Sequence, residues 1–226
     1  MESKYTIEYA KIYKYIMSGI TSNMYITIKK NHALIVDPNE NEHAVALLKE
    51  SGVEDITIIL THEHFDHISG VNYFRKRWSC VVYASNACKE MVADPNKNLS
   101  AFFMAMFIDK PEEERKQAQG VFKENYSCQV DIGFDREYNM MWNDLSIKMR
   151  VTPGHSLGSI CILINDRYLF SGDSLVEGNK VITRLPGGSR KAYNETTRPF
   201  FESLPEDTIV FPGHGQESLL GELELG

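Results

Sequence analysis

The sequence has few cysteines, and none of them form a paired motif. Its 226 residues include four cysteines, at positions 80, 88, 128 and 161, with no C-x-x-C pair among them. Structural zinc ribbons and dithiol redox sites are usually built on such pairs, so neither kind of site is expected. We predict four free thiols in a reducing compartment.

Long apolar runs are also missing. The longest wholly apolar run, residues 101–108, has eight residues, whereas a membrane-spanning helix needs about 20. Glu8, Lys11 and Lys14 interrupt the N-terminal stretch, which therefore lacks the apolar core of a signal peptide. We expect a cytoplasmic protein with no membrane partner.

The sequence also lacks an excess of basic residues. The chain has 24 Lys and Arg against 31 Asp and Glu, a formal net charge of −7, and this gives no electrostatic footprint for a nucleic-acid partner. A small-molecule substrate is the better expectation. Because no repeat and no Gly/Ser-rich or Pro-rich linker divides the sequence, we predict one domain over 1–226. The sequence carries no signal for the oligomeric state.

What the sequence does contain is a series of short β-rich runs. Runs rich in Val, Ile and Tyr and bounded by turn formers predict strands. They lie at 24–28, 33–36, 56–60, 81–83, 147–151, 160–164 and 208–211. Residues 42–50 place apolar and charged side chains on different faces and predict a short helix.

The stretch 87–128 differs from the rest and is predicted to be an inserted helical pair. Residues 101–108 are nearly all Phe, Met and Ala, while 111–120 are strongly charged. One interpretation is a core helix followed by a solvated one, since apolar residues at helical spacing usually pack inside. The other is a lid or an apolar wall of a substrate pocket, because Met adapts to varied ligands.

The segment 61–67, THEHFDH, is the sharpest chemical signal in the chain. It follows a predicted strand and places four potential metal ligands, His62, His64, Asp66 and His67, within six positions. A loop leaving a strand can turn alternate side chains to different sides, so His62 and His64 can serve one metal while Asp66 and His67 serve a neighbour. Imidazole and carboxylate donors suit zinc, iron or manganese, and the lack of thiolate disfavours a structural zinc site.

Three further segments each place a potential ligand beside a glycine. They are PGHS with His155, SGDS with Asp173 and PGHG with His214, and each follows a strand-like run. Glycine lets the backbone pass close to a cluster, so we predict that these ligands are presented at one edge of a sheet. His32 and His43 have no such setting, and no metal role is expected for them.

The order of these motifs resembles that of the metallo-β-lactamase-fold hydrolase superfamily. The resemblance runs from IVDP at 35–38 through THEHFDH, TPGHSLGS and FSGDSL to FPGHG, and only the insert lies outside it. It implies an α+β fold, an αββα sandwich of two mixed β-sheets flanked by helices, with metals in a groove at one edge.

The resemblance also implies two metal sites joined by one carboxylate. The implied ligands are His62, His64 and His155 for the first metal, Asp66, His67 and His214 for the second, and Asp173 as the bridge. Asp37 matches a position that in relatives keeps the ligands oriented from behind. The implied cofactors are two divalent metal ions, with zinc expected and iron or manganese as alternatives.

This ligand set implies a hydrolase that uses a metal-bridging hydroxide. Asp66 is the expected catalytic residue, orienting the hydroxide and passing a proton to the leaving group. Asp173 stands where zinc β-lactamases often place Cys, so the set is most similar to the glyoxalase II branch, which hydrolyses the thioester of hydroxyacylglutathione. Only twelve residues follow His214, too few for the C-terminal domain with which glyoxalase II binds glutathione.

We therefore expect a thioester or related carboxylic ester as substrate. The alternatives are a small-molecule phosphodiesterase, a mononuclear iron sulfur dioxygenase, a lactonase, a β-lactamase-type activity and a non-catalytic binding module stabilised by metal. Phe102 and Phe103 of the insert are predicted to meet an apolar part of the substrate. Arg184, which follows Asp173, is predicted to meet an anionic group.

Overall fold

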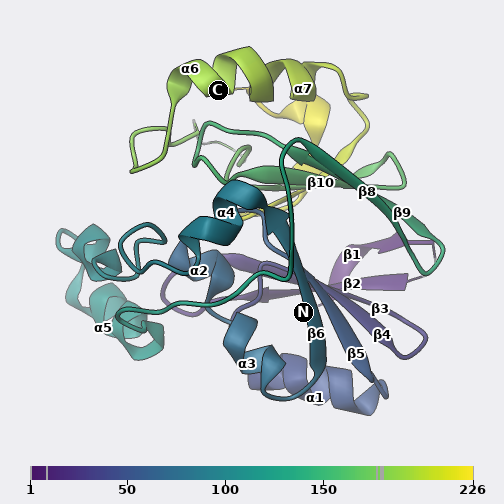
Figure 1. Cartoon of the computed structure of the whole chain (residues 1–226), viewed down its shortest axis with the longest axis horizontal. Helices are drawn as coiled ribbons and strands as arrows, with labels where there is room; N and C mark the ends of the chain where they lie inside the picture. The colour runs from purple at the N-terminus through teal and green to yellow at the C-terminus, as the bar shows by residue number, and fades with distance from the viewer. Residues whose placement is uncertain (1, 9, 177, 179–180, 226) are drawn as a thin grey trace.

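Two β-sheets contain all seven strands that the sequence predicts. The computed structural model describes residues 2–8, 10–176, 178 and 181–225. Within these ranges the two sheets pack against each other and helices cover both outer faces (Figure 1). Both sheets are mixed, so the predicted αββα sandwich is confirmed. None of the helices in the described ranges is long and apolar enough to cross a membrane.

The first sheet contains β1 to β7 in chain order. Its strands are β1 (Glu2–Ile7), β2 (Ala10–Ile16), β3 (Asn23–Lys29), β4 (His32–Val36), β5 (Asp55–Ile59), β6 (Ser79–Ser85) and β7 (Ile132–Phe134). Neighbours from β1 to β4 pair antiparallel, whereas those from β4 to β7 pair parallel. Because β4 and β5 run in the same direction, the residues that follow them meet at one edge of the sheet.

The second sheet has the order β13-β12-β11-β10-β9-β8. Its strands are β8 (Glu137–Trp142), β9 (Leu145–Val151), β10 (Ile160–Ile164), β11 (Tyr168–Gly172), β12 (Ile209–Pro212) and β13 (Ser218–Leu219). Strands β11 and β12 are parallel, and β9 runs in their direction because β10 is antiparallel to both β9 and β11. The carboxyl ends of β9, β11 and β12 therefore share one edge.

Helices supply the crossovers that parallel pairs require. Their bounds are α1 (Glu42–Glu50), α2 (Phe65–Ile68), α3 (Val71–Arg75), α4 (Asn86–Met91), α6 (Arg190–Ala192) and α7 (Arg198–Glu202), with a π-helix η2 (Tyr193–Thr197) between the last two and a 3-10 helix η3 (Leu220–Glu222). The predicted helix at 42–50 is α1, whose N-cap Asn41 accepts a hydrogen bond from the amide of Ala44. Helices α1 and α3 cover the first sheet, and α6 and α7 cover the second (Figure 1).

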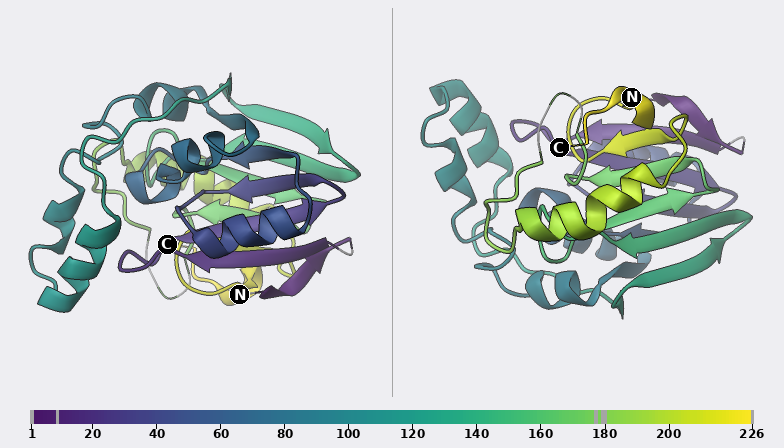
Figure 2. Two further views of the ribbon diagram at one scale, coloured as in Figure 1. Left: turned by 90° about the horizontal axis from the view of Figure 1, so that it is seen from below. Right: turned by 90° about the horizontal axis from the view of Figure 1, so that it is seen from above.

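The insert projects from the side of the sandwich at which α2 lies (Figures 1 and 2). After α4 it contains a 3-10 helix, η1 (Phe103–Phe107), and an α-helix, α5 (Glu112–Val121). The apolar run at 101–108 therefore forms a 3-10 helix flanked by turns. Most of α5 is exposed and only Ala118 is buried along it.

The interior between the two sheets is apolar and rich in aromatic rings. Phe170 of β11 stacks on Phe211 of β12 with ring centroids 4.8 Å apart. Tyr25 of β3 meets both rings edge-on, at 5.3 and 5.5 Å. These contacts join the sheets directly behind the edge at which the polar motifs gather.

Candidate metal centre

The first group of ligands consists of three buried histidines. His62 and His64 follow β5, and His155 follows β9, so the two sheets contribute to the same cluster. The exposed fraction of each residue is 4% or less, and their ligand atoms lie within 4.8 Å of one another. The sequence predicted that these three residues share one metal, and the fold brings them together.

Hydrogen bonds orient these three rings. His62 Nδ1 lies 3.0 Å from Thr61 Oγ1, and His155 Nδ1 lies 2.9 Å from the carbonyl oxygen of Ile182. The opposite nitrogen of His155, Nε2, lies 3.0 Å from Nδ1 of His64. His155 thus faces the cluster with Nε2, whereas His64 faces it with Nδ1.

Burial keeps the first group uncharged. It lowers the pKa of His62 well below its usual range, lowers that of His64 to about 3 and lowers that of His155, and the neighbouring imidazoles add to the effect. All three rings are therefore neutral at pH 7. Neutral imidazole is the form that binds a divalent cation.

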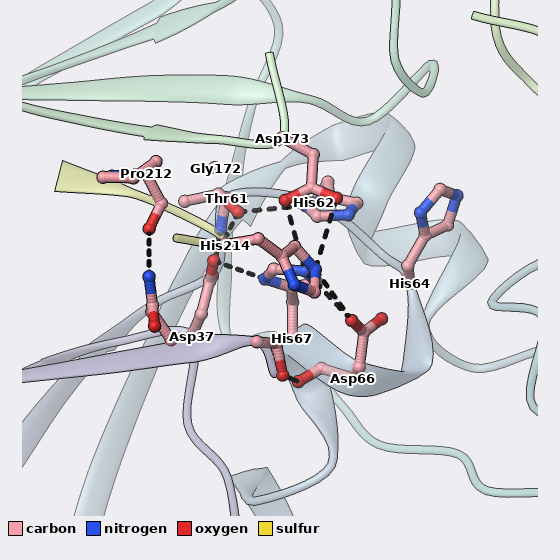
Figure 3. Close-up of polar contacts among 12 residues, drawn as sticks. Asp37, Thr61, His62, His64, Asp66, His67, Gly172, Asp173, Pro212 and His214 are labelled. Carbon is pink, nitrogen blue, oxygen red and sulfur yellow. Dashed lines mark hydrogen bonds and ion pairs between the residues drawn. The ribbon is translucent and has the colours of Figure 1, made fainter. Parts of the chain in front are cut away.

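The second group consists of Asp66 and His67, both on α2, and His214, which follows β12. Asp66 Oδ2 lies 3.3 Å from Nε2 of His67 and 3.3 Å from Nε2 of His214. Figure 3 shows the carboxylates of Asp66 and Asp173 on opposite sides of these imidazole nitrogens. The structure thus brings together the residues predicted for the second metal.

Asp173 lies between the two groups. Its Oδ1 is 3.5 Å from Nε2 of His67, and its Oδ2 is 3.5 Å from Nε2 of His155 and 3.6 Å from Nε2 of His214 (Figure 3). One carboxylate therefore contacts imidazoles of both groups, which is the position that the sequence predicted for a bridge.

The second group, unlike the first, carries charged side chains. Burial alone would lower the pKa of His67, but Asp66 and Asp173 raise it well above its usual range. The same two carboxylates raise the pKa of His214. Burial alone would raise the pKa of Asp66, but His67 and His214 hold it well below its usual range. A divalent cation would replace the protons of these two imidazoles.

Asp37 supports His67 from behind the cluster. Its Oδ2 lies 2.9 Å from His67 Nδ1 and accepts the hydroxyl of Thr61 at 2.6 Å, while Oδ1 accepts the amide of Thr61 at 2.7 Å. Burial raises the pKa of Asp37 against the opposing effect of these partners. The carboxylate fixes the ring so that Nε2 faces Asp66 and Asp173. Thr61, which sequence reasoning did not single out, joins this network to His62.

Two glycines allow the ligands to approach so closely. A side-chain Cβ built on Gly213 would lie 2.2 Å from Asp173 Oδ1 and 2.8 Å from His67 Cε1. At Gly172, where φ is +51°, a Cβ would lie 2.5 Å from Thr61 Oγ1. Neither space admits a methyl group, so the predicted need for glycine beside the ligands is confirmed at these two positions.

Sequence reasoning missed Glu63, a buried carboxylate that lies between the ligands His62 and His64 in the sequence. It is 1% exposed and accepts the hydroxyl of Ser156 at 2.9 Å, so it connects the segment after β5 to the segment after β9. Burial raises the pKa of Glu63 to about 7, against the lowering effect of its hydrogen bonds. A Glu between two histidine ligands, and a Ser beside a third, were the available signals.

The buried nitrogen and oxygen atoms of the two groups fit divalent cations. His62 Nε2 is buried and has no hydrogen-bond partner among the described residues, and His67 Nε2 and Asp173 Oδ1, which also lack a hydrogen bond, lie at an ion-pair distance of 3.5 Å from each other. An unpaired buried polar atom costs about 1–3 kcal/mol, and several in one place indicate a missing common partner. All of these atoms are nitrogen or carboxylate oxygen, the donors that zinc, iron and manganese accept.

The three residues predicted to bind substrate differ in exposure: Phe103 is buried, whereas Phe102 and Arg184 are exposed. Phe103 is 2% exposed and packs on Phe65 and Phe122, so its ring belongs to the core and offers no surface to a ligand. This corrects the prediction for Phe103. Phe102 is 44% exposed and lines an open cavity of about 710 Å³ between η1 and α5. Arg184 is exposed on the segment after β11.

A family model and several curated proteins match this chain over most of its length. A family model described as the metallo-beta-lactamase superfamily matches residues 18–214. A probable metallo-hydrolase, YqgX of Bacillus subtilis (strain 168), is 31% identical over 202 residues, which cover 88% of this chain and 87% of the relative. The hydroxyacylglutathione hydrolase of Enterobacter sp. (strain 638) is 26% identical over 82% of this chain but over only 58% of its own length.

A solved structure gives the same result. The crystal structure of BLEG-1, a B3 metallo-beta-lactamase, matches with a TM-score of 0.79 and 26% identity, and the match covers 93% of this chain and 95% of that one. The family model spans most of the sequence, and both ligand groups lie inside that span. The chain therefore belongs to the metallo-β-lactamase superfamily.

Proposed function

We propose that the chain is a dinuclear metal hydrolase that cleaves a thioester or a related carboxylic ester. The observation that carries the proposal is the pair of ligand groups sharing Asp173. His62, His64 and His155 would hold one divalent cation, and Asp66, His67 and His214 the other. Zinc is the proposed metal, and iron or manganese would suit the same donors.

The chemistry needs no nucleophilic side chain. When bound, such cations lower the pKa of coordinated water and polarise a carbonyl oxygen. Asp66 is ionised at neutral pH, and its side chain keeps 10% of its surface exposed at the edge of the cluster. It is placed to accept a hydrogen bond from the attacking water and to return that proton when the carbon–sulfur or carbon–oxygen bond breaks.

The choice of a thioester is supported by the ligand set and by one relative. The carboxylate of Asp173 contacts both groups, and the hydroxyacylglutathione hydrolase of Enterobacter matches four-fifths of this chain. Because that enzyme is much longer than the match, its glutathione specificity is not part of the proposal. The substrate proposed here is an acyl thioester in general.

A second candidate is hydrolysis of the β-lactam amide. The observation that favours it is the match to the B3 metallo-beta-lactamase BLEG-1 over nearly the whole of both chains. Water would attack a carbonyl carbon in this reaction too, so the same residues would serve, and the leaving group would be an amine.

Parallel assays of the zinc-loaded protein test both candidates. An acyl thioester, a β-lactam and a phosphodiester are each incubated with the wild type, with His62→Ala and with His43→Ala. His43 is an exposed histidine on α1, so its variant controls for the loss of a histidine alone. Thioester cleavage that is lost in His62→Ala and retained in His43→Ala is the expected result. Cleavage of the β-lactam alone would replace the substrate class, and cleavage of none would overturn the proposal.

A further inference from the structure

The turn that joins β2 to β3 contacts both chain segments that supply the second group. Ser22 pairs with His214 in an isolated β-bridge, and its Oγ donates to the carbonyl oxygen of Asp66 at 3.0 Å. The amide of Asn23 donates to the carbonyl oxygen of Gly213 at 2.7 Å. The turn therefore joins the α2 segment to the segment after β12.

Thr21, next to Ser22 in this turn, contacts the His214 ring itself. Thr21 Oγ1 lies 3.4 Å from His214 Nδ1, while Nε2 of the same ring faces Asp66 and Asp173. A hydroxyl that accepts the Nδ1 proton leaves Nε2 free for a cation. His214 has more need of such a partner than the other ligands, because its side chain is 28% exposed.

The backbone at Thr21 adopts a strained conformation. Its φ is +72°, in the left-handed region, where a β-branched residue is strained by about 1–3 kcal/mol. Glycine would adopt this conformation without strain, but it has no hydroxyl. Gly19, two residues earlier in the turn, also has a positive φ of +76°, and there a Cβ would lie 2.6 Å from the backbone of Gln117 and Ala118.

We propose that Thr21 is a positioning residue for the second metal: its hydroxyl holds the His214 ring so that Nε2 faces the cation. The inference rests on the metal-binding part of the proposed function and is independent of the substrate. The Thr21 hydroxyl contacts His214, a residue of the second group, so we expect its effect at the second site.

Zinc affinity separates this role from a general effect on the fold. The two dissociation constants for Zn²⁺ are measured by competition with a chromophoric chelator for the wild type, Thr21→Val and Thr21→Ser. The site that disappears in His214→Ala is the second site. We expect Thr21→Val to weaken that site about tenfold and to leave the other unchanged, as is usual when a partner of a ligand is removed. Thr21→Ser, which keeps the hydroxyl, should restore the affinity.

Two further variants make the test decisive. Thr196→Val, at an exposed threonine of η2, is the matched control and should leave both constants unchanged. Thr21→Gly removes the strain together with the hydroxyl, so it should unfold no more easily than the wild type and yet bind the second Zn²⁺ more weakly. Equal constants in Thr21→Val and wild type would overturn the inference, as would equal weakening of both sites. If His214→Ala retained two Zn²⁺ sites, the proposed metal centre itself would fail.

Discussion

His67 is the residue at which the polar contacts of the site converge. Its ring is fully buried, its Nδ1 faces the carboxylate of Asp37, and its Nε2 faces those of Asp66 and Asp173. Three carboxylates around one imidazole explain why its pKa is raised although burial alone would lower it. The raised pKa favours a proton on this ring at neutral pH, and a divalent cation would take the place of that proton.

The close contact between Gly213 and Asp173 predicts that a single added methyl group weakens metal binding. Gly213→Ala would place a methyl group 2.2 Å from Asp173 Oδ1, and the carboxylate would have to move away from both ligand groups. We expect Zn²⁺ affinity to fall about tenfold or more and hydrolysis to fall with it. Isothermal titration with Zn²⁺ measures the change.

The control for this substitution is another glycine in the same chain. Gly120 lies within α5, and a Cβ at that position would meet no atom within 4 Å. Gly120→Ala should bind Zn²⁺ like the wild type and be more stable by about 0.5–1 kcal/mol, because alanine favours the helix. If Gly213→Ala bound Zn²⁺ as tightly as the wild type, the position of the Asp173 carboxylate would not matter for metal binding, which would contradict the prediction.

At the scale of elements, each ligand segment follows the carboxyl end of a strand. The segment 61–67 follows β5, Asp37 follows β4, and His155, Asp173 and His214 follow β9, β11 and β12. Parallel or co-directed strands bring these ends to one edge, so residues far apart in sequence meet there.

This arrangement determines how much the sequence could predict. The strands with dense Val and Ile, such as β5 and β10, and the clustered motif at 61–67 are visible from local pattern alone. Strands β2 and β8 were missed because neither forms a dense apolar run: exposed Lys11 interrupts β2, and half-buried positions alternate with exposed ones such as Met141 in β8. Thr21 could not be assigned from sequence, because its partner His214 lies 193 residues away. Glu63 had a local signal in its place between two histidines, but its pairing with Ser156, 93 residues away, is visible only in the fold.

The insert supplies support for α2, and this leads to a second prediction. Phe65 at the start of α2 contacts the rings of Phe103 and Phe122 at 5.2 and 5.4 Å, and its amide donates to the carbonyl oxygen of Asn98. Phe103→Ala should lower the free energy of unfolding by about 3–5 kcal/mol, as buried Phe truncations do. Urea unfolding followed by circular dichroism measures this change.

The neighbouring Phe102 is the matched control because it is the same residue type but half-exposed. Phe102→Ala should change the free energy of unfolding by about 0.5 kcal/mol or less. Similar losses for the two variants would show that the insert does not pack as the structure has it.

At the scale of the whole molecule, the site joins the two sheets. The first sheet presents Asp37 and the segment 61–67, whereas the second presents His155, Asp173 and His214. Behind this edge the sheets are joined by Tyr25, Phe170 and Phe211. At the edge itself, buried imidazoles and carboxylates replace apolar contacts, so the two sheets meet there through polar groups of the ligand cluster.

Metal removal should therefore destabilise the entire domain and not only the edge. A cation that binds the folded chain raises the free energy of unfolding by about 1.4 kcal/mol for each tenfold rise in its free concentration and for each site. At 1,000 times the dissociation constant this is about 4 kcal/mol per site, which for a chain of this length corresponds to roughly 8–16 °C in Tm. Thermal unfolding in zinc buffers of graded free concentration measures the slope.

The slope also counts the sites. Wild-type protein with two sites should gain about 2.7 kcal/mol per tenfold rise in free Zn²⁺ once both are filled, and His214→Ala, which lacks a ligand of the second group, should gain half as much. His43→Ala should follow the wild type. A Tm that did not depend on free Zn²⁺ would contradict the prediction, because cations held between two sheets must stabilise the packing of one sheet on the other.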